Sequence, residues 1–181
     1  QRAGFDSIKI NAVAVKGLFE TDVVPLARFG REHGFQIRYI EFMPLDAQGL
    51  WDKSRVLLME DILRMLGEEF GPLEPVPDPD PRAPALEFRF PDGRGTVGFI
   101  ASVSRPFCLN CNRIRLTADG HLRYCLFALE ETEVKSLLRG GAGDEEIRET
   151  IRRTVADKWL GHEIQQAGFV PPPRPMYAIG G

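Results

Sequence analysis

The sequence has no cysteine before Cys108 and only three in 181 residues. Three is an odd number, and the Cys108-x2-Cys111 spacing is typical of metal ligands, so we expect a reducing compartment such as the cytoplasm rather than a disulfide framework. The chain also lacks any apolar run near the ~18 residues of a membrane span. Its net charge of −3 argues against nucleic acid or an anionic membrane as a partner. Any anion must therefore be bound by a local group of cations.

The amino-terminal part predicts a strand, a helix and a second strand. The apolar run from Ile8 to Val15 is typical of a strand that is buried on both faces. Thr21 is a plausible N-cap for the helix that follows, with Pro25 in its first turn. The second strand is expected over 36–43. Two strands joined in this way pair in parallel, which makes this part of the chain α/β.

The rest of the chain alternates between regular elements and loops. Apolar residues at helical spacing predict a helix over 59–70, and six prolines within 71–84 predict an extended loop. Alternation over 86–100, around a turn at Asp92-Gly93, predicts a hairpin. Asp144 is expected to cap a last helix, whose inner stripe would be Ile147, Ile151, Val155 and Trp159.

All three cysteines lie in one stretch, 104–127, and a second hairpin is predicted to bring them together. Residues 113–117 alternate as a strand, Asp119-Gly120 is a turn signal, and 122–124 returns. Folding about this turn brings Cys125 back near Ile114, within a few residues of Cys111. The pattern Cys-x2-Cys-x13-Cys is therefore compatible with one shared metal site.

Three interpretations of these thiols stay open. In the first, the thiols are buried and reduced. In the second, they bind zinc with His121 as a poorly placed fourth ligand, and in the third they bind a [4Fe-4S] cluster. We favour the cluster, because iron–sulfur clusters usually take four cysteines and three would leave one iron open to substrate.

Four basic residues are candidates for binding an anion. Arg113 and Arg115 lie two apart on a predicted strand, so both point to one face and would repel each other unless they bind a phosphate or remain solvated. Lys9 lies inside the first strand and needs a partner. That partner is either Glu41 on the next strand or an anionic substrate that Lys9 shares with Arg38.

A known family carries the same motifs. The stretch PFCLNCNRIRLTADGHLRYCLF, the ending MYAIGG and KINAV near the start resemble the GTP 3′,8-cyclases, radical S-adenosylmethionine enzymes that begin molybdenum cofactor (molybdopterin) synthesis. The resemblance runs over nearly the whole chain. It departs at one point: the family's amino-terminal C-x3-C-x2-C motif, on which S-adenosylmethionine is cleaved, has no counterpart here. The chain therefore resembles the carboxy-terminal portion of such an enzyme.

The resemblance implies a fold and an activity. It implies an α/β fold in which residues 1–45 are the last part of a TIM-type radical S-adenosylmethionine barrel and 46–181 form an α+β iron–sulfur and GTP-binding domain. The complete lyase would convert GTP to 3′,8-cyclo-7,8-dihydro-GTP through a deoxyadenosyl radical, whereas this chain alone is expected to be inactive. A second [4Fe-4S] cluster and S-adenosylmethionine would belong to the complete enzyme, and a homodimer stays among the candidates.

The resemblance also assigns roles to single residues. Cys108, Cys111 and Cys125 would hold the carboxy-terminal [4Fe-4S] cluster, whose open iron binds guanine. The GTP phosphates would be bound by Lys9, Arg38, Arg113 and Arg115. Met43 would lie beside S-adenosylmethionine, and the tail Gly180-Gly181 would reach the active site. The alternative is a zinc-stabilised domain that binds a nucleotide or an acidic partner without catalysis.

Overall fold

A computed structural model describes residues 3–46, 48–77, 82–158, 164 and 166–179. The chain forms two compact units, which are described separately below. The first comprises Gln1–Met43 with Trp51–Phe107, and the second comprises Pro44–Leu50 with Cys108–Gly181. Residues 51–107 thus fold with the amino-terminal part, so these units differ from the domains expected at 1–45 and 46–181, which stay a prediction for the complete enzyme.

The first unit is built on a mixed five-stranded sheet, with strand order β1-β2-β5-β4-β3. The strands β1 (Lys9–Ala14), β2 (Gln36–Glu41) and β5 (Thr96–Ile100) run parallel. The antiparallel strands β4 (Leu86–Arg89) and β3 (Glu74–Pro75) complete it. The expected parallel pair and the expected hairpin over 86–100 are both confirmed, and β5 joins the hairpin to the parallel strands.

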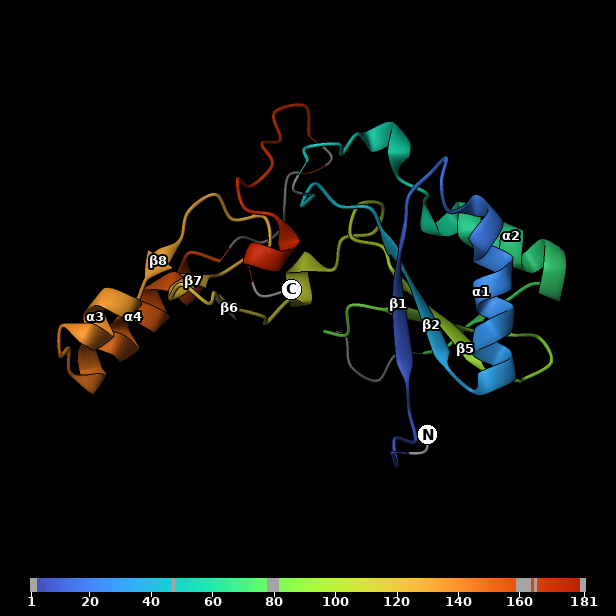
Figure 1. Cartoon of the computed structure of the whole chain (residues 1–181), viewed down its shortest axis with the longest axis horizontal. Coiled ribbons are helices and arrows are strands. Elements are labelled where there is room, and N and C mark those ends of the chain that lie inside the picture. The colour runs from blue at the N-terminus through green and yellow to red at the C-terminus, as the bar shows by residue number, and fades with distance from the viewer. Residues whose placement is uncertain (1–2, 47, 78–81, 159–163, 165, 180–181) are drawn as a thin grey trace. The chain divides into compact units, whose positions relative to one another are not determined.

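Two helices, α1 (Glu20–His33) and α2 (Met59–Phe70), lie against the same side of this sheet (Figure 1). A short 3-10 turn, η1 (Lys53–Arg55), precedes α2. The bounds of α2 agree with the sequence, but the expected N-cap of α1 at Thr21 is wrong. The helix already begins at Glu20, whose carboxylate accepts the Gly17 backbone N–H at 2.7 Å and so satisfies a donor near the helix start.

The core of the first unit lies between these helices and the covered face of the sheet. Tyr39 stacks on Phe99 at 5.7 Å between ring centroids, and its hydroxyl donates to the Val23 carbonyl at 2.7 Å. Burial raises the pKa of Tyr39 well above its ordinary value. Gly30 lets α1 approach the sheet closely, because a Cβ there would lie 2.6 Å from Ile37 Cγ1.

The other face of the sheet is not covered to the same degree. Along β1, Lys9, Asn11 and Val13 are exposed, and Val13 exposes 49% of its surface. The expectation that this strand is buried on both faces is therefore wrong for the chain as it stands. Continuous apolar character does not reveal which face neighbouring elements cover.

The second unit contains a three-stranded antiparallel sheet, β6 (Arg115–Leu116), β7 (His121–Arg123) and β8 (Thr132–Glu133). Its helical elements are η2 (Cys108–Asn110), α3 (Lys135–Arg139), α4 (Asp144–Ala156) and η3 (Met176–Ala178).

Helix α4 buries a different face from the one expected. Its buried residues are Thr150 and Thr154, while Ile151 and Val155 are 37% and 44% exposed. The Thr154 hydroxyl donates to the Thr132 hydroxyl at 2.9 Å, so a polar contact fixes this face toward β8. The N-cap is Gly143 rather than Asp144, which is the first helical residue. The expected fourth stripe residue, Trp159, lies outside the described residues.

Among the described residues, every helix is too short or too polar to cross a membrane.

Candidate functional site

The three cysteines lie at the two arms of the predicted hairpin. We call residues 108–127 the cysteine hairpin. Cys108 and Cys111 are joined by the 3-10 turn η2, in which the Cys111 N–H donates to the Cys108 carbonyl at 3.1 Å. Across the turn, Arg115 pairs with Arg123, and continuing that register would bring Cys125 opposite Arg113. The hairpin is thus confirmed, and the extended register would bring Cys125 near Ile114, as expected.

The Asp119-Gly120 turn has the backbone that its sequence predicts. Gly120 has φ +90°, a conformation that side chains disfavour, and a Cβ there would lie 2.5 Å from Lys135 Cβ. The Gly120 N–H donates to the Thr117 carbonyl at 3.0 Å. Glycine is therefore required at this position for two reasons, the turn conformation and the close approach of α3.

The thiols lie among positive charges. All three are free and partly exposed. Although burial opposes ionisation of Cys111, hydrogen bonds from the backbone and side chain of Arg113 and the charge of Lys158 lower its pKa overall. Burial and the charge of Arg113 lower the pKa of Arg115, while Cys125 and Cys111 oppose that shift. Arg115 therefore lies within electrostatic range of thiols from both arms.

Lys158 joins the two arms and was not identified from the sequence. Its Nζ donates to the Arg113 carbonyl at 3.0 Å and to the Tyr124 carbonyl at 2.6 Å. Both acceptors are next to or near the thiols, so the ammonium closes the hairpin where the cysteines lie. A single lysine after a helix carries no local signal for this role, because both of its acceptors are more than thirty residues away in sequence.

The strand of the first arm is shorter than expected. It includes Arg115 and Leu116 only, so Arg113 precedes it, and the expectation that both arginines alternate along one strand is not met. Arg113 is exposed and Arg115 is partly buried. Their charges nevertheless interact, because Arg113 lowers the pKa of Arg115. Two guanidiniums that repel each other form a place where an anion would be stabilised.

The donor set fits a thiolate-held metal group in its chemistry. Three free thiols and a lowered Cys111 pKa are what metal–thiolate bonds require. His121 does not join them, because its Nδ1 faces Asp119 Oδ2 at 3.4 Å. Across 3–46, 48–77, 82–158, 164 and 166–179, no three His, Cys, Asp or Glu side chains are arranged so as to hold a metal ion. Holding a cluster would therefore require the thiols to draw closer together.

A second group of polar residues lies on the open face of the five-stranded sheet. Lys9 pairs in register with Gln36, and Asn11 with Arg38, so Lys9 and Arg38 are diagonal neighbours on one face. Arg38 Nε donates to Gln36 Oε1 at 2.9 Å, and its guanidinium lies 3.6 Å from a Glu87 oxygen.

Gly98 makes room for the Arg38 side chain. A Cβ at this position would lie 3.0 Å from Arg38 Cγ, so a larger residue would force the arginine aside. Arg38 is thus held by Gln36 and Glu87, with its side chain packed over Gly98.

Glu41 is not the partner of Lys9. It points to the covered face, is 3% exposed, and accepts the backbone N–H groups of Met59 at 3.1 Å and Val103 at 2.9 Å. It also accepts the N–H of Ser104 at 2.7 Å and its hydroxyl at 2.5 Å. The carboxylate therefore joins the end of β2 to the start of α2 and to the segment after β5.

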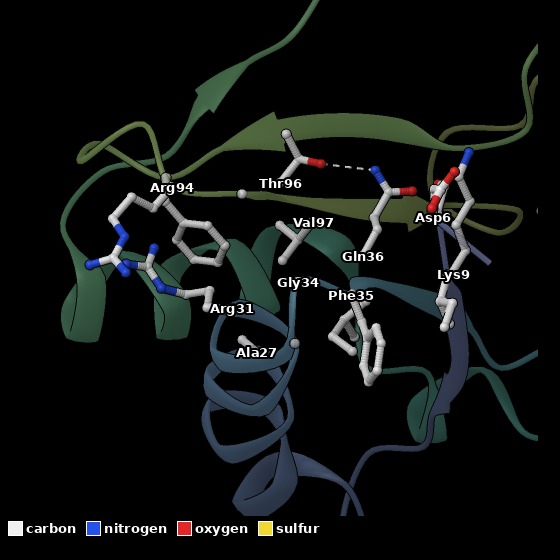
Figure 2. Close-up of a pocket in the computed structure, with 16 residues that line it drawn as sticks. Asp6, Lys9, Ala27, Arg31, Gly34, Phe35, Gln36, Arg94, Thr96 and Val97 are labelled. Atoms are coloured by element: carbon white, nitrogen blue, oxygen red, sulfur yellow. Dashed lines mark hydrogen bonds between the residues drawn. The ribbon is translucent and has the colours of Figure 1, made fainter. Parts of the chain in front are cut away.

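A cavity of about 360 Å³ opens where the parallel strands begin (Figure 2). Lys9 and Asp6 lie at one end of it, while Arg31 and Arg94 lie at the other. Arg31 is bound by Asp92 at 2.5 Å and lies over the Phe90 ring, 4.2 Å from its centroid. The cavity therefore has a lysine and an aspartate at one end and two arginines at the other, with apolar side chains such as Phe90 and Val97 lining it between them.

The structure separates the other candidates along the strands. Lys9 begins β1 and Arg38 lies early in β2, whereas Met43 follows the carboxyl end of β2 and is partly buried. The two basic residues are thus together, and Met43 lies at the opposite end of the strands. Gly180 and Gly181 lie outside the described residues.

Comparisons with known proteins connect these features to a family. Proteins named GTP 3′,8-cyclase are similar over nearly the whole chain. The one from Rhodopirellula baltica is 47% identical over 181 residues, which cover 99% of this chain and 50% of that protein. The one from Mycolicibacterium smegmatis is 48% identical over 187 residues, covering 99% and 50%. GTP 3′,8-cyclase 2 of Mycobacterium tuberculosis is 46% identical over 183 residues, covering 99% and 51%.

The chain thus spans about half the length of the curated relatives it matches. Residues 35–164 match the family described as Molybdenum Cofactor Synthesis C. That range includes Arg38, the three cysteines, Arg113, Arg115 and Lys158. The match covers most of the chain, so this protein belongs to the Molybdenum Cofactor Synthesis C family.

Proposed function

We propose that the chain acts as part of a GTP 3′,8-cyclase, in which it binds the GTP that is rearranged to 3′,8-cyclo-7,8-dihydro-GTP. The similarity to proteins with this name over nearly the whole chain supports the proposal. The observation that carries it is the cysteine hairpin, in which Lys158 donates to the carbonyls of Arg113 and Tyr124 and so closes the two arms that carry the thiols. Thiolates for a metal group and cations for an anion are thereby combined in one place.

We propose that Cys108, Cys111 and Cys125 hold a [4Fe-4S] cluster. When bound, such a cluster supplies an iron without a protein ligand, at which a nitrogen or oxygen of guanine can bind. The surrounding residues would favour this arrangement, because Arg113 and Lys158 stabilise the thiolate form of Cys111. Lys158 would also keep the two arms from separating.

The triphosphate would be bound by four cations from two groups. Arg113 and Arg115 would neutralise phosphate oxygens next to the cysteine hairpin, and the anion would relieve their mutual repulsion. Lys9 and Arg38 would do the same on the open face of the sheet, where Gln36 and Glu87 orient the Arg38 guanidinium in advance. A guanidinium that is already oriented loses less entropy when it binds.

Other residues of this chain would have roles only in the complete enzyme. We propose that residues 1–45 continue a TIM-type barrel, that Met43 lies beside S-adenosylmethionine bound there, and that Gly180-Gly181 reaches the substrate. A second cluster would belong to the remaining half. We further propose that the protein works in the cytoplasm, where its thiols stay reduced.

Anaerobic reconstitution with iron and sulfide tests the proposal. The chain should bind about four iron and four sulfide ions, the content that defines a [4Fe-4S] cluster. The reconstituted chain should then bind GTP more tightly than guanosine. Stoichiometric zinc without sulfide in anaerobically prepared protein would instead indicate the zinc-stabilised binding domain. The matched control is Cys125→Ser, which should lose the cluster while the five-stranded sheet keeps its circular dichroism.

A further inference from the structure

The end of the described chain is fastened to the cysteine hairpin by one arginine. We propose that Arg174 is a positioning residue. It fixes the C-terminal segment, residues 174–179, against the Asp119-Gly120 turn and the loop that follows Cys125. The importance of this position for catalysis rests on the proposed function. The attachment itself rests on contacts within the second unit alone.

Arg174 bridges two carboxylates from different elements. Its Nη2 lies 2.8 Å from Asp119 Oδ2 in the hairpin turn and 2.8 Å from Glu131 Oε2 before β8. The hydrogen bond from Arg174 is the main cause that lowers the pKa of Asp119, and Asp119 in turn raises the pKa of Arg174. Because Glu131 is only 14% exposed, its half of the bridge is better shielded from water.

Glu131 continues the network to the loop that follows the third cysteine. It also forms an ion pair with Arg123, whose side chain is fully buried. The Arg123 guanidinium donates to the carbonyl of Ala128 at 2.5 Å and to that of Leu126 at 3.4 Å. These carbonyls belong to the loop that follows Cys125, in which the Ala128 N–H donates to the Cys125 carbonyl at 3.3 Å. An alternating series of guanidiniums and carboxylates thus runs from this loop through Arg174 to the hairpin turn.

Two more contacts show where Arg174 holds the chain. The Met176 N–H donates to the Leu45 carbonyl at 2.9 Å, and Ile179 is fully buried. Pro173 and Pro175 restrict the backbone on both sides of Arg174. Because this backbone has few conformations, the ion pairs of the guanidinium also fix the path of the chain next to it. The segment is therefore directed by a bridge at its start and by an apolar anchor at its end.

Hydrogen exchange of the Met176 amide tests the attachment in the 181-residue chain. Two partly exposed ion pairs of ordinary strength correspond to about three- to tenfold faster exchange when both are lost. We expect this for Arg174→Gln, and a smaller effect for Arg174→Lys, which can reach one carboxylate. Asp119→Asn should also have a smaller effect, because Glu131 keeps its bond to Arg174.

The matched control is Arg148→Gln, which removes an ion pair with Glu145 on the exposed surface of α4. It should leave the Met176 amide unchanged. Unchanged exchange in Arg174→Gln as well would overturn the attachment. If Arg174→Gln unfolds the second unit, Arg174→Lys and Asp119→Asn decide the question instead, and wild-type exchange in both overturns it.

Kinetics of the complete enzyme test the catalytic consequence. Arg174→Gln should lower kcat at least tenfold while the GTP dissociation constant and iron content stay as in the wild type, and Arg174→Lys should recover part of kcat. Faster exchange with an unchanged kcat would overturn the positioning role. A complete wild-type enzyme that does not cyclise GTP would refute the proposed function, whereas the exchange result would still decide the attachment.

Discussion

Replacing Glu41 by glutamine should destabilise the first unit strongly. The carboxylate is 3% exposed and accepts four hydrogen bonds. One oxygen accepts from the Val103 and Ser104 amides, and the other from the Met59 amide and the Ser104 hydroxyl. An amide group keeps one acceptor oxygen and turns the other into a donor. Whichever oxygen is replaced, one buried amide and one part-buried group of Ser104 therefore lose their acceptor.

Each buried donor that loses its partner costs roughly 1–3 kcal/mol, so Glu41→Gln should lower the free energy of unfolding by roughly 2–6 kcal/mol. Proteins of this size have only about 5–15 kcal/mol in total. The lower bound, ~2 kcal/mol, corresponds to a Tm lower by about 4–8 °C. Urea titration followed by far-UV circular dichroism and tryptophan fluorescence measures it, with a lower midpoint and an unchanged slope expected.

Glu87→Gln is the matched control, because Glu87 lies on the open face, is partly exposed and meets Arg38 at a long 3.6 Å. It should cost less than about 1 kcal/mol. Equal effects of the two substitutions, or a loss below about 1 kcal/mol for Glu41→Gln, would refute the argument that the buried carboxylate organises three segments.

Four further outcomes are expected. Arg113→Ala and Arg115→Ala should each weaken GTP binding by about one to two powers of ten and guanosine binding much less, since a lost charge-assisted bond costs roughly 1.5–3 kcal/mol. If calorimetry shows equal losses of affinity for both ligands, the two arginines do not bind the phosphates. Chelating the iron of the reconstituted chain should abolish its preference for guanine nucleotides, and retained preference would separate binding from the cluster. The chain alone, reduced and supplied with S-adenosylmethionine, should form no deoxyadenosine, which chromatography detects. Deleting Gly180 and Gly181 from the complete enzyme should abolish turnover but not iron binding; normal cyclisation would make the tail dispensable.

Local signals were sufficient for the elements and for the cysteine hairpin. The 3.6-residue spacing over 59–70 gave the bounds of α2, and Asp119-Gly120 gave the turn, because each depends on residues that are neighbours in sequence. The spacing Cys-x2-Cys-x13-Cys, read together with that turn, was enough to place Cys125 opposite the first arm. The family followed from the same motifs, and its assignment is confirmed.

The tertiary structure alone decided which faces are covered and which charges meet. Period-two alternation places Glu41 and Lys9 on opposite faces only once register is known. Helix α4 buries Thr150 and Thr154, and β8 offers the Thr154 hydroxyl a partner at Thr132. Lys158 and Arg174 bind acceptors dozens of residues away, so nothing beside them in sequence indicates their roles. A sequence fixes local geometry through sterics and hydrogen bonding between neighbours, whereas the partners of a long charged side chain depend on which distant segments the folded chain brings within its reach.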